Sequence, residues 1–164
     1  TVIGQGNTLM TPFHNALLMC AVANDGVLMK PYVIDHIEGA DNTTVKENIP
    51  EIYADLMSKK DAKKLQKMLR EVVTDGTGYS LDTDLYTAAG KTGTAENEGK
   101  YAHAWFVGYS NVEDPDLVVC VLVENTGAGS KYAVPIAKKI FNSYYNNNMK
   151  EYYGEKKNTA QSDE

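Results

Sequence analysis

AAGKTGTAENEGKYAHAWFVGYS, residues 88–110, is the most informative stretch of this sequence. Its first part places Lys91 between Gly90 and a run of small residues, and its last part, 103–110, has the aromatic and apolar residues typical of a β-strand. The polar segment between them, 97–101, is short enough to join two antiparallel strands. A Gly-Lys-Thr triplet is compatible with two chemistries, phosphate binding and acyl transfer to a serine. The surrounding residues have to decide between them.

A third strand is predicted at 117–125, after a second short polar link. Three strands with links of this length favour an antiparallel meander over about 86–125. The third strand is apolar on both faces, so we expect it to be covered on both sides. One cover is a predicted terminal helix that presents Ala133 and Phe141 on one face and has Pro135 in its first turn.

A first helix is predicted to begin at Thr11 and Pro12, because the hydroxyl caps free amides and proline is tolerated in a first turn. Apolar residues on most sides of this helix predict that it is the most buried one, and the Asn-Asp-Gly sequence at 24–26 ends it. Residues 27–38 are predicted to be extended, with Pro31 at an edge or a bulge.

The polar segment 39–57 has weak periodicity and is predicted to be a loop, with a short strand near Ile49 as an open alternative. Ser58 and Asp61 resemble a capping box, which predicts a second helix over about 59–73. The TDGTG sequence that follows ends this helix and leads into the quoted stretch.

Composition and charge exclude several classes of function. The chain has 164 residues, 43% hydrophobic and 23% charged, which fits one soluble domain. A formal net charge of -6 without a basic cluster speaks against a nucleic-acid partner, and no apolar run approaches the roughly 20 residues that span a bilayer. Cys20 and Cys120 lie in apolar segments and are predicted to be buried thiols rather than a disulfide or a metal site. Because the sequence starts without Met, we expect an excised piece or a processed product.

The phosphate-binding alternative fails on spacing. A Walker A loop needs a glycine five residues before the glycine of the triplet, and that position is Leu85. The loop must also open a helix, whereas two more glycines and a predicted strand follow Gly90. The early GQGNTL sequence likewise fails as a dinucleotide fingerprint, because its third glycine would fall at Leu9.

The triplet Lys91-Thr92-Gly93 resembles the K-T-G signature of penicillin-binding proteins and serine β-lactamases, which lies on a strand. GKTGTAEN followed by HAWFVGYS is similar to the third motif and next strand of class B penicillin-binding proteins, the monofunctional peptidoglycan transpeptidases. The G-Q-G and T-P segment, the LREVVTDGTG helix and turn, and the Pro-containing terminal helix also resemble that family. The resemblance keeps the family's order over about residues 3–145.

The resemblance implies roles for the site residues. Lys91 and Thr94 are implied to be catalytic, and Thr92, Gly93 and Thr94 to bind substrate. Lys91 would hold the proton network of the reacting serine and attract a substrate carboxylate, which the Thr92 or Thr94 hydroxyl would bind. Gly93 would let the substrate lie against the strand edge, and the Thr94 N–H would point at the developing oxyanion. No cofactor and no metal are implied.

The resemblance also implies an α/β fold of the α+β type, with an antiparallel meander and packed helices. Residues 1–145 would form the C-terminal portion of the transpeptidase domain. The composition of 146–164, which is polar with little to bury, predicts a tail that frays or is disordered. The implied partners are the peptidoglycan stem peptide, β-lactams, the N-terminal part of the domain and other cell-wall synthesis proteins. The implied location is the outer face of the bacterial cytoplasmic membrane, for a membrane-anchored parent of which this piece alone is soluble.

The family's nucleophile is not found in this sequence. It lies in S-x-x-K, with S-x-N as the second motif, and none of the six serines has Lys three residues later or Asn two residues later. The chain alone is therefore expected to be inactive, and the intact parent to be a serine-type DD-transpeptidase that binds β-lactams. A β-lactam sensor or a noncatalytic cell-wall-binding relative stays open as an alternative, which the sequence upstream of Thr1 would test.

Other polar and aromatic residues are given structural roles. Three histidines are predicted to make structural polar contacts, two acidic residues to lie in a solvated loop, and three aromatic residues to belong to the core. The histidines are His14, His36 and His103, the acidic residues are Glu96 and Glu98, and the aromatic residues are Trp105, Phe106 and Tyr109.

Overall fold

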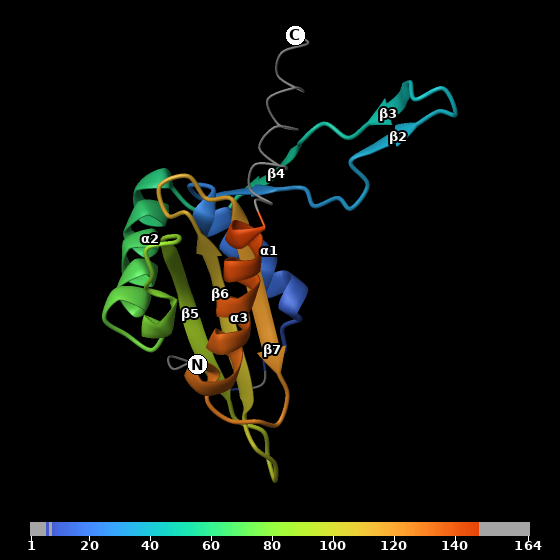
Figure 1. The fold of residues 1–164 in the computed structure, drawn as a ribbon. Coiled ribbons are helices and arrows are strands. Elements are labelled where there is room, and N and C mark those ends of the chain that lie inside the picture. Colours follow the sequence, from blue (N-terminus) through green and yellow to red (C-terminus); the bar gives the residue numbers. More distant parts are fainter. Residues whose placement is uncertain (1–5, 7, 148–164) are drawn as a thin grey trace.

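A three-stranded antiparallel sheet forms the centre of the computed structural model, which describes residues 6 and 8–147. Its strands are β5 (Ala88–Ala95), β6 (His103–Ser110) and β7 (Leu117–Val123), in the order β5-β6-β7 (Figure 1). Each strand is antiparallel to its neighbour. The predicted α+β fold class and the predicted meander are therefore confirmed.

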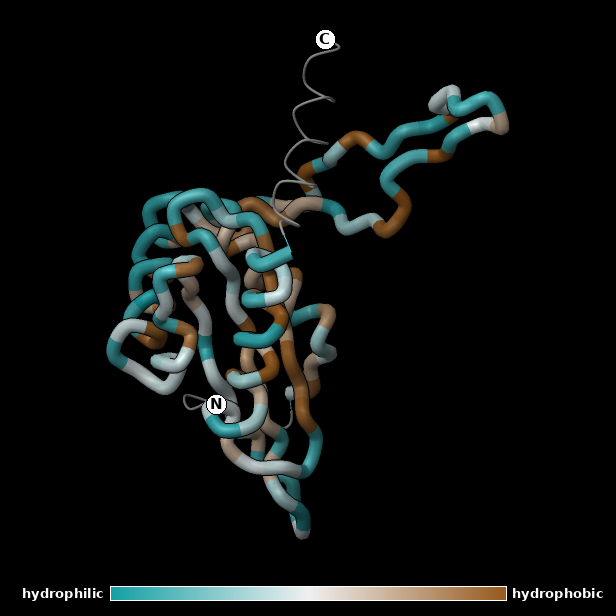
Figure 2. Tube along the Cα trace, viewed as in Figure 1, coloured by the Kyte–Doolittle hydropathy of each residue, from teal (hydrophilic) through white to brown (hydrophobic). Residues whose placement is uncertain are grey.

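Helices cover both faces of this sheet (Figure 1). α3 (Gly129–Asn146) packs on one face, where Phe106 of β6 is fully buried. α1 (Pro12–Ala23) packs on the opposite face, where Tyr109 is fully buried. β7 is brown along much of its length in Figure 2 and contacts both helices, so the predicted cover on both sides is confirmed. Trp105 is only partly buried, so the core prediction holds for two of the three aromatic residues.

The first two helices begin where the sequence predicts. The side-chain oxygen of Thr11 accepts the amide of the third residue of α1 at 3.1 Å. Ser58 caps α2 (Lys59–Thr74) by accepting the amide of Asp61 at 3.2 Å, and its hydroxyl donates to the Asp61 carboxylate at 2.8 Å. Gln66, buried on α2, donates to the carbonyl of Val22 at 2.7 Å, which fastens α2 to the end of α1. A short 3-10 helix, η1 (Tyr79–Leu81), leads on toward β5.

Two glycines make room for the Phe106 ring against the sheet. Gly90 and Gly108 lie opposite each other on β5 and β6. A Cβ added at either glycine would lie 2.7 Å from Phe106 Cζ, well inside the 3.4 Å at which ordinary contacts begin. The glycine before Lys91 therefore has a packing role.

One expectation about the helices is confirmed and one is wrong. α1 has the largest buried share of the three described helices, with four of its 12 residues buried against four of 16 in α2 and five of 18 in α3. Phe13 and Leu18 are nevertheless 60% and 46% exposed, on a side that no described element covers. Pro135 is not in the first turn, since α3 already begins at Gly129. Pro135 lies on an exposed side of the helix, where solvent can satisfy the carbonyl that lacks its amide partner.

The loop prediction for 39–57 is also wrong in part. β3 (Thr44–Glu47) pairs with β2 (His36–Glu38), and β4 (Ile52–Asp55), close to the open alternative near Ile49, pairs with β1 (Val27–Met29). The β2–β3 hairpin stands away from the central sheet in Figure 1, and every residue of β3 is exposed. A strand without a buried face lacks the hydrophobic alternation that reveals strands in a sequence.

The remaining expectations are met only in part. Both cysteines are free, as predicted, but Cys20 and Cys120 are partly rather than fully buried, and this burial raises the pKa of each thiol. Asn146 belongs to α3, and the rest of the predicted tail lies outside the described residues from 148 onward. Among the described helices, none combines the length and the hydropathy needed to cross a membrane.

Candidate functional site at the edge of strand β5

The predicted site residues, Lys91 to Thr94, lie in the middle of β5, an edge strand of the central sheet. The carbonyl oxygen of Thr87 points to β6, because it accepts the amide of Asn111 at 2.7 Å. The carbonyl oxygen of Ala88 points the other way, to the outer side of β5 that faces away from β6, and accepts Arg70 Nη1 at 2.9 Å. Because backbone direction alternates along a strand, the Thr92 carbonyl and the Thr94 N–H also turn to the outer side. This edge therefore presents the alternating backbone donors and acceptors with which an added peptide strand forms hydrogen bonds.

Lys91 places a positive charge at this edge. Its side chain is exposed, and Nζ donates to the carbonyl oxygen of Thr92 at 2.7 Å. The ammonium group therefore lies on the side to which the Thr94 N–H turns. A cation in this position favours the binding of a carboxylate and the stabilisation of a developing oxyanion.

Two hydroxyl groups lie on the α3 face of the same strand. Thr92 is opposite Phe106, which packs under α3, and Thr94 shares that face because side chains alternate along a strand. Thr92 Oγ1 lies 2.6 Å from Thr77 Oγ1, and Thr94 Oγ1 accepts the amide of Gly129 at 3.4 Å. Sequence reasoning missed Thr77 and Gly129 as neighbours of the site. These contacts bridge 15 and 35 residues, and no local spacing signals them.

Two glycines, Gly93 and Gly129, permit close approaches on the two faces of β5. A Cβ added at Gly93 would lie 3.1 Å from Trp105 Cβ. On the other face, a Cβ added at Gly129 would lie 2.4 Å from the carbonyl oxygen of Gly93 and 2.3 Å from that of Trp105. The start of α3 therefore rests directly on the backbone of the strand that carries the site.

The polar residues next to the site make structural contacts. His103 Nδ1 accepts the amide of Asn125 at 3.1 Å, which is the kind of contact predicted for this histidine. Asn97 Nδ2 donates to Asn125 Oδ1 at 2.8 Å, so the loops that follow β5 and β7 are tied together. Glu96 and Glu98 are exposed, in agreement with the prediction of a solvated loop.

The other two histidines also make structural contacts. His14 Nδ1 lies 2.9 Å from Thr11 Oγ1 at the start of α1. His36, on the β2–β3 hairpin, lies 3.1 Å from Asp35 and 3.1 Å from Glu38. These carboxylates, Asp35 more than Glu38, raise the pKa of His36.

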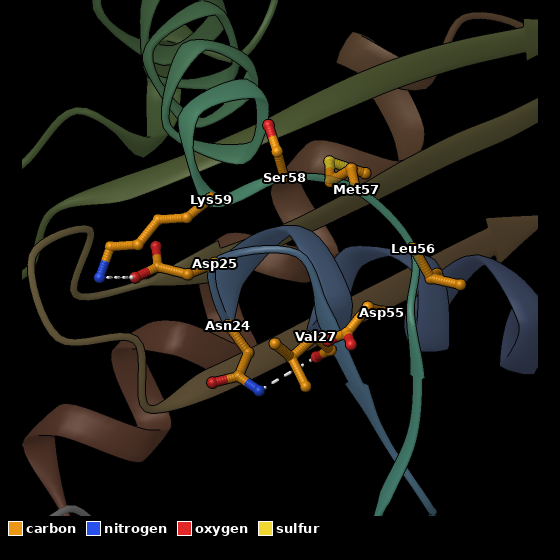
Figure 3. Close-up of a pocket in the computed structure, with 8 residues that line it drawn as sticks. All are labelled: Asn24, Asp25, Val27, Asp55, Leu56, Met57, Ser58 and Lys59. Carbon is orange, nitrogen blue, oxygen red and sulfur yellow. Dashed lines mark hydrogen bonds and ion pairs between the residues drawn. The ribbon is translucent and has the colours of Figure 1, made fainter.

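A shallow hollow lies between the end of α1 and the start of α2 (Figure 3). Its charged groups are paired, since Asp25 contacts Lys59 at 2.9 Å and Lys63 at 2.8 Å. Hydrogen bonds from the two lysines, Lys63 more than Lys59, lower the pKa of Asp25 to about 2. We assign this hollow a structural role in joining the two helices. In the part of the chain that the structure describes, no three His, Cys, Asp or Glu side chains are grouped to hold a metal ion.

Known proteins are similar to this chain in sequence and in fold. The family model described as the penicillin binding protein transpeptidase domain matches residues 1–142. The peptidoglycan D,D-transpeptidase PbpA of Mycolicibacterium smegmatis is 33% identical over 147 residues, which are 83% of this chain and 29% of that protein. The peptidoglycan D,D-transpeptidase MrdA of Haemophilus influenzae is 34% identical over 168 residues, 90% of this chain and 25% of that protein.

Solved structures agree with these matches. An imipenem acyl-enzyme complex of penicillin-binding protein A from M. tuberculosis is similar with a TM-score of 0.78 and 29% identity, over 86% of this chain and 32% of that one. The chain thus spans about a quarter to a third of the relatives it matches. The class B resemblance drawn from the sequence is confirmed, and the chain belongs to the penicillin-binding protein transpeptidase domain family.

Proposed function

We propose that this chain is the C-terminal portion of the transpeptidase domain of a membrane-anchored bacterial protein that cross-links peptidoglycan through an acyl-serine intermediate. One observation carries the proposal: the Lys91 ammonium and the outward-turned Thr94 N–H lie together on an edge strand. The family membership supports it. We propose that the domain faces the outside of the cytoplasmic membrane, where the protein works with other cell-wall synthesis proteins.

In the proposed mechanism the stem peptide lies along the outer edge of β5 as an added strand. Its carboxylate is held by the Thr92 and Thr94 hydroxyls and attracted by Lys91, and Gly93 leaves the edge open. The serine attacks the scissile carbonyl of the D-Ala-D-Ala peptide, and the Thr94 N–H donates to the oxygen that becomes negative. The C–N bond breaks, the serine proton passes to the leaving amine, and the terminal D-Ala departs. The amine of a second stem peptide then attacks the acyl-serine ester, which forms the cross-link and frees the serine. A β-lactam acylates the same serine. The mechanism uses no cofactor and no metal.

The nucleophile is proposed to come from the N-terminal part of the same domain. None of the six serines in this chain stands in S-x-x-K, so the chain supplies the K-T-G edge alone and is inactive by itself. The uncovered side of α1 supports this arrangement, because Phe13 and Leu18 are apolar and more than two fifths exposed. Leu9, just before α1, is 94% exposed. We propose that the N-terminal part covers these side chains.

A fluorescent penicillin tests the proposal on the full-length protein. We expect one covalent adduct, mapped by peptide mass spectrometry to a serine outside residues 1–164, and no adduct on the isolated 164-residue chain. Preincubation with unlabelled penicillin should abolish the label. Labelled protein that produces no cross-linked peptide from a stem-peptide substrate would favour a sensor. An adduct on a serine of this chain, or no adduct at all, would overturn the proposal.

A further inference from the structure

The side chain of Thr77, outside the motif, touches the predicted carboxylate-binding residue Thr92. Their hydroxyl oxygens lie 2.6 Å apart, a short distance for two neutral hydroxyl groups. Thr77 belongs to the turn between α2 and η1. Thr92 lies on β5, two residues before Thr94. The contact therefore joins the G-T-G turn to the K-T-G strand.

The turn that carries Thr77 is held firmly against α2. The amide of Gly78 donates to the carbonyl of Val72 at 2.9 Å. A Cβ added at Gly76 would lie 2.8 Å from that same oxygen, and one added at Gly78 would lie 3.2 Å from it. Val73, the next residue of the helix, is fully buried in the core. These glycines let the turn fold back on the helix, which fixes where Thr77 points.

A second contact fixes the strand relative to the same helix. Arg70 of α2 donates to the carbonyl of Ala88 at 2.9 Å, and its other terminal nitrogen contacts Asp82 at 2.8 Å. β5 therefore contacts α2 at Ala88 and the turn that follows α2 at Thr92. The distance between Thr77 and Thr92 is set by a rigid helix, a folded-back turn and an anchored strand.

A threonine hydroxyl has a single proton to donate. If Thr92 donates that proton to a carboxylate while it keeps the contact with Thr77, then Thr77 must be the donor in that contact. A hydroxyl that accepts a hydrogen bond also becomes a better donor. We propose that Thr77 is a positioning residue that orients the Thr92 hydroxyl toward the substrate carboxylate; this inference rests on the function proposed above.

The test compares two forms of one substrate on the full-length protein. Benzylpenicillin carries the free carboxylate, and its methyl ester does not. We expect Thr77→Val to slow acylation by benzylpenicillin by about five- to tenfold, as for the loss of one hydrogen bond. Acylation by the ester should stay within about twofold of its wild-type rate, because Thr77 acts only through carboxylate recognition. Thr77→Ser, which keeps the hydroxyl, should restore the rate with benzylpenicillin.

Two controls separate positioning from a general effect on folding. Thr74→Val makes the same chemical change in the last turn of α2, where the hydroxyl contacts only its own helix carbonyl at 3.4 Å among the contacts described, and should leave both rates unchanged. In a Thr92→Val background, Thr77→Val should cause no further loss. If Thr77→Val does not fold, Thr77→Ala, which also lacks the hydroxyl, replaces it in the same comparison.

The outcomes distinguish this inference from the function on which it rests. A wild-type protein that neither compound acylates would overturn the proposed function, and this inference with it. A wild-type protein that is acylated normally, with a Thr77→Val variant that is unaffected or slowed equally with both compounds, would overturn the inference about Thr77 alone.

Discussion

Replacing Gly129 by alanine tests the contact between α3 and the site strand. An added Cβ would meet the carbonyl oxygens of Trp105 and Gly93 at 2.3 Å and 2.4 Å, whereas ordinary contacts begin at 3.4 Å. Because both oxygens belong to the backbone, neither can rotate away, and the start of α3 must withdraw by about 1 Å. Gly129→Ala therefore tests whether the helix start rests on the strand.

The expected change in stability is opposite in sign to the change that helix propensity alone predicts. Alanine is favoured over glycine in a helix by about 1 kcal/mol, so propensity alone predicts a more stable variant. Overpacking costs about 1–3 kcal/mol, and two fixed backbone oxygens place this case near the upper end. The net expectation is a loss of about 2 kcal/mol in the free energy of unfolding.

Urea unfolding of the 164-residue chain measures this loss, with the fluorescence of Trp105, its only tryptophan, as the probe. With a slope of about 2 kcal/mol per molar urea, the midpoint should fall by about 1 M. Ser130→Ala, at the exposed next residue of α3, is the matched control and should leave the midpoint unchanged or raise it. A Gly129→Ala chain as stable as the wild type would refute the close approach.

Two further changes test the contacts around the site, both read by urea unfolding of the same chain. Arg70→Met removes the donor to Ala88 and the ion pair with Asp82, and should lower the free energy of unfolding by about 1–2 kcal/mol; full stability in this variant would contradict the anchoring of β5. The pKa of Asp25 is lowered to about 2 in the folded chain, below the roughly 3.9 of an unfolded aspartate. The Asp25 carboxylate therefore stabilises the folded chain above about pH 4, and this stabilisation is lost as the pH falls toward 2. Asp25→Asn should therefore reduce stability at neutral pH by no more than about 1 kcal/mol, because the carboxylate is partly exposed, and should flatten the decline between pH 4 and 2; an unchanged decline would contradict the role of these ion pairs.

The sequence allowed the central sheet and its covers to be predicted. The strand around Phe106 has a dense apolar pattern, and β7 is apolar on both faces, so both strands carry strong local signals. The capped start of α2 at Ser58 was predictable for the same reason, since a cap and its partner lie three residues apart. Local signals of this kind need no knowledge of the tertiary structure.

The features that the sequence did not reveal depend on surroundings. Phe13 is apolar and suggests burial, but exposure depends on what lies over the helix. β3 is exposed on all sides and offers no alternation to detect. At the site, the residue types at Lys91 and Thr92 indicated the chemistry, while the contact with Thr77 arises only when α2 and β5 are brought together.

The rate at which a penicillin acylates a Lys91→Ala variant of the full-length protein tests whether the cation at the β5 edge takes part in the reaction. Lys91 supplies the cation at the β5 edge, so its loss should slow acylation by about 100-fold or more, in line with the removal of other preorganised groups that stabilise a developing charge. Lys100→Ala, which removes an exposed lysine from the link after β5, should leave the rate unchanged, and His103→Ala should slow it far less than Lys91→Ala. Acylation of Lys91→Ala at the wild-type rate would show that Lys91 has no part in the reaction.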